Sequence, residues 1–91
     1  MKPKFSLGQL VATPGALRAF QAASESPFAY LQRHLSGDWG DVSEDDRAEN
    51  DYSLRQGLRL LSAYSLRNGE RVWVITEADR ASTCFLLPDE Y

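Results

Sequence analysis

The sequence predicts a single α+β domain spanning residues 1–91, in which short N-terminal helices precede a three-stranded antiparallel meander. Three observations predict this class. Helix-start signals at Thr13-Pro14, Ser26-Pro27 and Ser43 all fall in the first half of the chain. The second half contains the run RVWVIT at 71–76, which is rich in β-branched and aromatic residues. The dipeptide Asn68-Gly69, which is typical of a tight hairpin turn, comes just before it.

The first two helices are predicted from paired start signals. At Thr13-Pro14 and again at Ser26-Pro27, a residue that can cap a helix precedes a proline suited to the first helical position. The first helix is expected to end near Ser24. The second is expected to end before Gly37, because glycine adopts the left-handed conformation of a helix end without strain.

A third helix is predicted to begin after Ser43 and to lie at the surface along one edge of the domain. The acidic run Glu44–Asp46 falls in its first turn, where the helix dipole favours negative charge. Its apolar side is narrow. Asp51 is spaced to form ion pairs with Arg47 and Arg55, each four residues away on the same helix.

Three strands are predicted at 58–66, 71–77 and 83–87, and Pro88 ends the last one. If Asn68 and Gly69 form a two-residue loop, Tyr64 lies opposite Trp73 and Arg67 lies opposite Glu70. The segment 5–11 is either a fourth strand or an extended lead-in, because Gly8 weakens its strand pattern.

The composition restricts the class of protein. Thirteen acidic residues outnumber ten lysines and arginines, and the net charge of −3 argues against direct binding to nucleic acid. The single cysteine, Cys84, cannot form an internal disulfide, which predicts a cytoplasmic protein. No apolar run is long enough to span a membrane, and no motif predicts a cofactor or a metal.

Acidic residues concentrate between positions 38 and 51. This density could imitate a nucleic-acid backbone or bind a basic protein, and the plainer alternative is a solvated, capped surface helix. Trp39, between glycines and aspartates, is either an exposed anchor for a partner or a plug buried over the core. The predicted interaction residues are Asp38, Trp39, Asp41, Glu44, Asp45, Glu49 and Asp51.

Other residues are weaker candidates for chemistry. His34, the only histidine, could be a general base or a metal ligand, or a helix-end residue that stabilises the dipole. Cys84 is expected to be a small buried residue rather than a nucleophile. Glu77, Asp79 and Arg80, at the second turn, could bind an anion or form a hydrolytic site, although turns favour the same residue types for local hydrogen bonds.

Three runs also resemble a known family. FSLGQLVATPGAL at 5–17, HLSGDWG at 34–40 and ITEADRASTCFLLPDEY at 75–91 are similar to small bacterial proteins of roughly this length described as plasmid-related or hypothetical. The resemblance covers nearly the whole chain. It implies an origin in plasmids, integrative elements or phages, and it assigns no catalytic residue.

These observations favour a non-enzymatic protein-interaction module of a mobile genetic element. Its sharpest form is a counter-defence inhibitor, of the anti-CRISPR or anti-restriction type, whose acidic surface binds a basic nucleic-acid-binding complex. One alternative is a small ribonuclease-type toxin or other enzyme that uses His34 and Arg80. Another is an accessory protein with no dedicated ligand. The sequence leaves the partner and the oligomeric state open.

Overall fold

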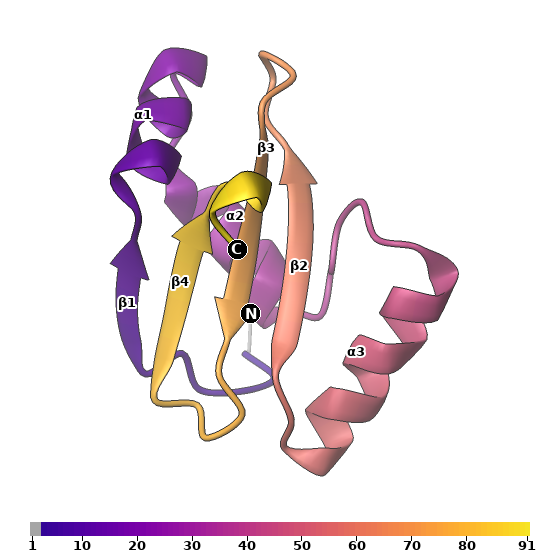
Figure 1. The fold of residues 1–91 in the computed structure, drawn as a ribbon. Helices are drawn as coiled ribbons and strands as arrows, with labels where there is room; N and C mark the ends of the chain where they lie inside the picture. Colours follow the sequence, from indigo (N-terminus) through magenta and orange to yellow (C-terminus); the bar gives the residue numbers. More distant parts are fainter. Residues whose placement is uncertain (1–2) are drawn as a thin grey trace.

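A computed structural model describes residues 3–91. Within these residues, three helices and a four-stranded sheet make up the fold (Figure 1). The elements are β1 (Gln9–Ala12), α1 (Pro14–Ala23), α2 (Pro27–Leu35), α3 (Glu44–Gln56), β2 (Leu60–Ser65), β3 (Arg71–Thr76), β4 (Ser82–Leu86) and the 3-10 turn η1 (Pro88–Glu90). The predicted α+β class is confirmed.

The sheet has the strand order β1-β4-β3-β2. β2, β3 and β4 form the predicted antiparallel meander. The fourth strand exists, but it pairs parallel to β4, so the sheet is mixed rather than wholly antiparallel. Two parallel strands need a long connection between them. The helices and the other two strands, which lie between β1 and β4 in the sequence, provide it.

The helix ends match the sequence signals. The side chains of Thr13, Ser26 and Ser43 each accept a hydrogen bond from a backbone N–H in the first turn that follows. α1 ends at Ser24 in the left-handed conformation, and Gly57 closes α3 with a φ of +72°. The three N-terminal caps satisfy backbone N–H groups that have no partner within the helix.

The β2–β3 hairpin has a different register from the one predicted. Ala63 lies opposite Trp73 and Tyr64 opposite Val72. The cause is a three-residue loop, 67–69, in which Gly69 has a φ of +88° and its N–H donates to Leu66 across 2.9 Å. The extra loop residue shifts the pairing by one, so that Tyr64 and Trp73 lie on opposite faces of the sheet.

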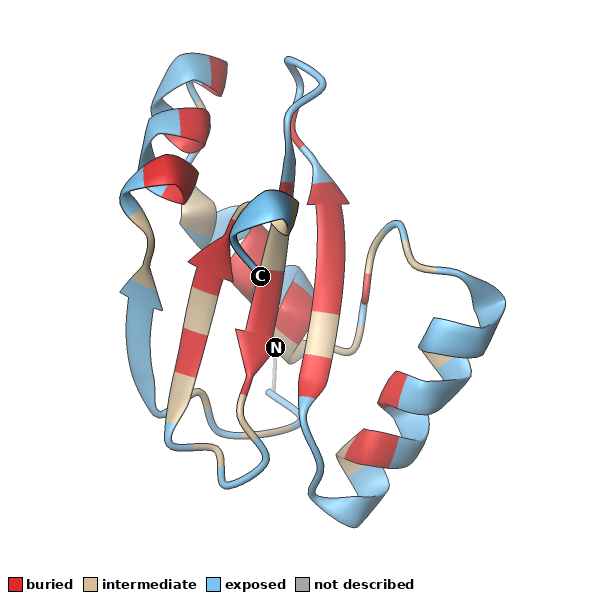
Figure 2. Ribbon diagram, viewed as in Figure 1, coloured by how far each residue is buried: buried red, intermediate tan, exposed pale blue. Residues whose placement is uncertain are grey.

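The main core lies between the inner face of the sheet and helices α1 and α2 (Figure 2). Alternation along β3 turns Val72 and Val74 toward these helices, where Phe20 packs edge-on against Phe85 at 5.3 Å between ring centroids. The buried core residues are Ala16, Ala19, Phe20, Ala23, Tyr30, Leu31, Tyr64, Leu66, Val72, Val74 and Phe85.

α3 lies beyond the edge of the sheet formed by β2, as the sequence predicts (Figure 1). The Asn50 carboxamide attaches it there, accepting from the Leu61 N–H at 3.0 Å and donating to the Leu61 carbonyl at 2.7 Å. The Asn50 side chain therefore makes the two hydrogen bonds to the Leu61 backbone that a neighbouring strand would make. On the outer face of the sheet, Tyr91 packs against Trp73 at 5.5 Å between ring centroids.

Candidate functional site

Trp39 is completely buried, so the predicted exposed anchor is wrong and the residue is a plug over the core. Its ring packs against His34 at 5.7 Å and stacks with Phe5 at 6.4 Å between centroids. Its Nε1–H donates to a carboxylate oxygen of Asp51 at 3.0 Å. Burial of an indole ring is favourable when its one polar group, the N–H, has a hydrogen-bond acceptor, and Asp51 is that acceptor for Trp39.

Three of the predicted interaction acids serve the fold. Asp38 forms an ion pair with Arg33 at 2.7 Å, and this hydrogen bond lowers the pKa of the Asp38 carboxyl. Asp41 accepts from the Ser65 hydroxyl at 2.7 Å. Asp51 holds Trp39, in place of the ion pairs with Arg47 and Arg55 that its spacing predicts. All three stay exposed, but they offer fewer free carboxylate oxygens to a partner because residues of the same chain already bind some of them.

The remaining carboxylates lie along the first half of α3. Glu44, Asp45 and Glu49 are exposed, and so is Asp46, which was not among the predicted interaction residues. The Glu44 side chain, 93% exposed, is 3.8 Å from Arg47. Within residues 3–91, Asp45, Asp46 and Glu49 form no ion pair. This half of the helix therefore carries the exposed carboxylates that are least engaged by other residues of the described chain.

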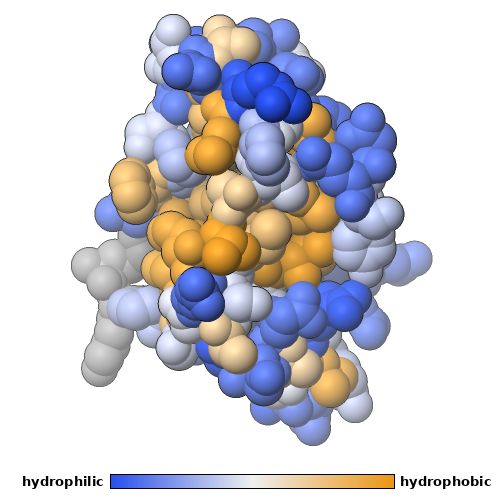
Figure 3. Space-filling view, turned by 60° about the vertical axis from the view of Figure 1, so that its left-hand side comes forward, coloured by the Kyte–Doolittle hydropathy of each residue, from blue (hydrophilic) through white to orange (hydrophobic). Residues whose placement is uncertain are grey.

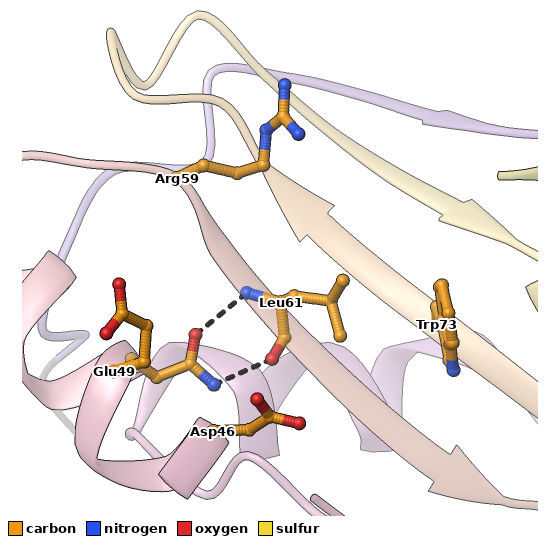
Figure 4. Close-up of a pocket in the computed structure, with 6 residues that line it drawn as sticks. Asp46, Glu49, Arg59, Leu61 and Trp73 are labelled. Atoms are coloured by element: carbon orange, nitrogen blue, oxygen red, sulfur yellow. Dashed lines mark hydrogen bonds between the residues drawn. The ribbon is translucent and has the colours of Figure 1, made fainter.

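Two of these acids line a groove between α3 and the outer face of the sheet (Figure 4). The groove has a volume of about 250 Å³. Asp46 and Glu49 come from the helix, while Trp73 contributes an aromatic surface from β3. The remaining lining residues are Asn50, Arg59 and Leu61. We call this feature the α3 groove.

Arg59, the one cation in the lining of the α3 groove, is already engaged. Its Nη1 donates to the Tyr91 hydroxyl at 2.8 Å, and its Nε lies 3.4 Å from a carboxylate oxygen of Glu77. Glu77 was predicted as part of a second-turn site, and the structure pairs it with Arg59 instead. The groove thus combines two carboxylates that have no cationic partner in the described chain with an aromatic wall.

His34 is buried in a continuous chain of hydrogen bonds. The Thr83 hydroxyl donates to the Leu7 carbonyl at 2.9 Å, so it accepts from Thr76 at 2.8 Å. Thr76 in turn accepts from the His34 Nε2–H at 2.9 Å, which leaves Nδ1 to accept from the Ser62 hydroxyl. Of the two neutral tautomers, this chain fits the one with its proton on Nε2.

The surroundings of His34 keep its ring neutral. Burial, with a smaller contribution from the positive charge of Arg80, lowers the pKa of His34 to about 4. Both ring nitrogens have hydrogen-bond partners, so neither is free to act as a base or a metal ligand in this structure. Within residues 3–91, no group of three His, Cys, Asp or Glu side chains is placed to hold a metal ion.

Arg80 connects the second turn to the end of α3. Its Nη1 donates to the carbonyls of Leu58 at 2.6 Å and Glu77 at 3.0 Å, and its guanidinium lies 5.7 Å from the centroid of the Phe5 ring. Asp79 accepts from the Ala81 N–H at 2.9 Å within the turn. The side chains of these three predicted residues therefore have separate structural partners: Arg59 for Glu77, the Ala81 N–H for Asp79, and backbone carbonyls near the end of α3 for Arg80.

Cys84 is half-buried on β4, and its thiol donates weakly to the adjacent Phe85 carbonyl at 3.4 Å. Burial raises the pKa of Cys84, with smaller contributions from the carboxylates of Glu90 and Glu77. A raised pKa disfavours the thiolate that a nucleophile requires. The environment is that of a packing residue, as the sequence predicts.

The sequence reasoning missed Trp73, Arg59 and Tyr91 as neighbours in one site. A signal for Trp73 was present, because alternation in RVWVIT places it on the face opposite Val72 and Val74. The incorrect hairpin register hid that signal by pairing Trp73 with Tyr64. Arg59 and Tyr91 lie 32 positions apart, and no local pattern connects them.

No known protein family matches the chain, and neither curated proteins nor solved structures show a significant similarity to it. In the part of the chain that the structure describes, no helix has the length and apolar character needed to cross a membrane.

Proposed function

We propose that this protein is a non-enzymatic interaction module whose α3 groove binds a basic side chain of a protein partner. The observation that supports the proposal is the juxtaposition of Asp46 and Glu49 with Trp73 around one groove. An arginine stacks on an indole face and pairs with carboxylates at the same time. At about 250 Å³ the groove is smaller than typical ligand pockets and suits a single inserted side chain.

The charges around the groove support the same class of partner. Glu44 and Asp45 extend the negative surface beyond the groove along the exposed side of α3. Such a surface increases the association rate of a basic partner and repels nucleic acid. The specific form that we propose is an inhibitor of a basic, nucleic-acid-binding complex in the cytoplasm, which would suit the mobile-element origin expected from the sequence.

The two tryptophans allow a direct test by NMR. Titration with N-acetyl-arginine amide should shift the indole N–H signal of Trp73 and leave that of the buried Trp39 in place. The paired change Asp46→Asn with Glu49→Gln should abolish the shift. A control variant, Glu70→Gln with Asp79→Asn, removes two exposed acids outside the groove and should shift as the wild type does.

Partner binding is tested with the same variants. A protein partner captured from a bacterial lysate should be lost from the Asp46→Asn, Glu49→Gln variant and from Trp73→Leu, and kept by the control. Asp51 is left unchanged because its carboxylate holds Trp39. Retention of the partner by both groove variants, or an arginine titration that leaves Trp73 unmoved, would overturn the proposal.

A further inference from the structure

The two edges of the sheet differ in how they are protected. At the β2 edge the loop before α3 blocks the backbone, since the Ala63 N–H donates to the Trp39 carbonyl at 3.0 Å and the Ala63 carbonyl accepts from the Asp41 N–H at 2.6 Å. The Asn50 side chain blocks Leu61 in the same way. β1 has a hydrogen-bonded neighbour on one side, β4, and its other side is open in Figure 1.

The open side of β1 has defined backbone groups. The N–H groups of Gln9 and Thr13 donate to carbonyl oxygens at β4 and just before it, at 2.9 and 3.0 Å. Because direction alternates along a strand, Leu10 and Ala12 point both their N–H and C=O groups away from β4. These are the groups that a further strand would pair with.

The side chains of β1 are uncharged, and all except that of Gln9 are apolar. Leu10 is 41% exposed and Val11 is 39% exposed. Hydrophobic residues gather in the middle of the face seen in Figure 3, between hydrophilic regions above and below it. No charged residue occurs from Phe5 to Leu17. Lysines and prolines, which protect sheet edges in many proteins, are absent from β1 itself.

We propose that β1 pairs antiparallel with β1 of a second copy of this chain, joining the two sheets into one. With Val11 opposite Val11 of the second copy, Leu10 and Ala12 of each chain exchange backbone hydrogen bonds across a two-fold axis. The neutral edge favours a copy of itself, because a charged peptide or nucleic acid would find no opposite charge there. The α3 groove lies at the opposite edge of the sheet and stays accessible in the dimer.

Sedimentation equilibrium across a concentration series tests the pairing. The wild-type mass should rise with concentration from 10.2 kDa toward twice that value. Leu10→Lys should stay monomeric at every concentration. Leu58→Lys is the matched control, because Leu58 is 43% exposed and lies outside β1, and it should dimerise as the wild type does.

A second variant tests the backbone contact itself. Leu10→Pro removes an outward N–H and leaves the bonds from β1 to β4 in place, so it should be folded by circular dichroism and monomeric. A wild-type protein that is monomeric up to about 1 mM, where even a weak contact of ~4 kcal/mol is half-formed, would overturn the proposal. A dimer that persists in Leu10→Lys would do the same.

Discussion

The indole N–H of Trp39 donates to the carboxylate of Asp51, and this contact connects a loop plug to the middle of α3. Trp39 is completely buried, so its N–H depends on that one acceptor. The contact also engages one carboxylate oxygen of Asp51, an exposed residue at the end of the most acidic segment. Part of a strongly acidic helix is thus needed to stabilise the core.

Asp51→Ala should destabilise the protein by about 1–2 kcal/mol, because the buried Trp39 N–H would lose its acceptor. Urea denaturation followed by far-UV circular dichroism measures the change. Asp45→Ala removes an exposed acid of the same helix and should alter stability by less than about 0.5 kcal/mol. Equal effects of the two substitutions would show that the Trp39–Asp51 hydrogen bond contributes nothing measurable.

Stability should fall as the pH falls from about 6.5 toward 4, because of His34. The folded state keeps the ring neutral with a pKa of about 4, while the unfolded chain protonates it near 6.5. The contribution of the neutral His34 ring to the free energy of unfolding is therefore fully present above the pKa of histidine in the unfolded chain. It is lost as the pH falls toward the pKa of His34 in the folded protein. It amounts to roughly 3 kcal/mol over this interval.

His34→Gln isolates that contribution, because glutamine does not titrate. Urea denaturation at several pH values between 4 and 7 should give a steeper pH dependence for the wild type than for the variant. Carboxylates titrate in both proteins and cancel in the difference. Parallel pH profiles would contradict the assignment of a buried neutral ring to His34.

Gly40→Ala should lower the free energy of unfolding by about 3 kcal/mol or more, because a strained backbone conformation and a steric overlap combine. Gly40 has a φ of +78°, and a Cβ there would overlap the carbonyl oxygen of Ala63. Gly57→Ala is the matched control, with a φ of +72° and no atom within 4 Å of the added Cβ, and should cost only about 1–2 kcal/mol. Thermal unfolding of both variants compares them directly, and similar losses would mean that the Gly40 contact relaxes.

The helix boundaries could be predicted because their causes are local. Thr13, Ser26 and Ser43 each act on an N–H group two or three residues away, and that relationship is visible in the sequence. The direction of β1 could not be predicted in the same way. It depends on a partner strand more than seventy positions away in the chain, for which no local signal exists.

The two tryptophans show why the site was only partly predicted. Trp39 lies in a Gly-Asp loop that looks exposed, but His34, Phe5 and Asp51 enclose it from three different segments. Trp73 lies in a strand that looks buried, but alternation along β3 puts it on the outer face, and the extra hairpin-loop residue separates it from Tyr64, its predicted neighbour. The sequence shows Asp46 and Glu49 as acidic residues of a surface helix. The groove between them and Trp73 could not be predicted, because it depends on where α3 lies relative to the sheet.

The parallel pairing of β1 with β4 has a consequence for synthesis on the ribosome. Gln9–Ala12 emerges before its partner, Ser82–Leu86, which is made more than seventy residues later. Contacts so distant in sequence form late and slow folding. The inner sides of α1 and α2 therefore stay uncovered during synthesis until β4 has been made, because the sheet that packs against them is incomplete before then.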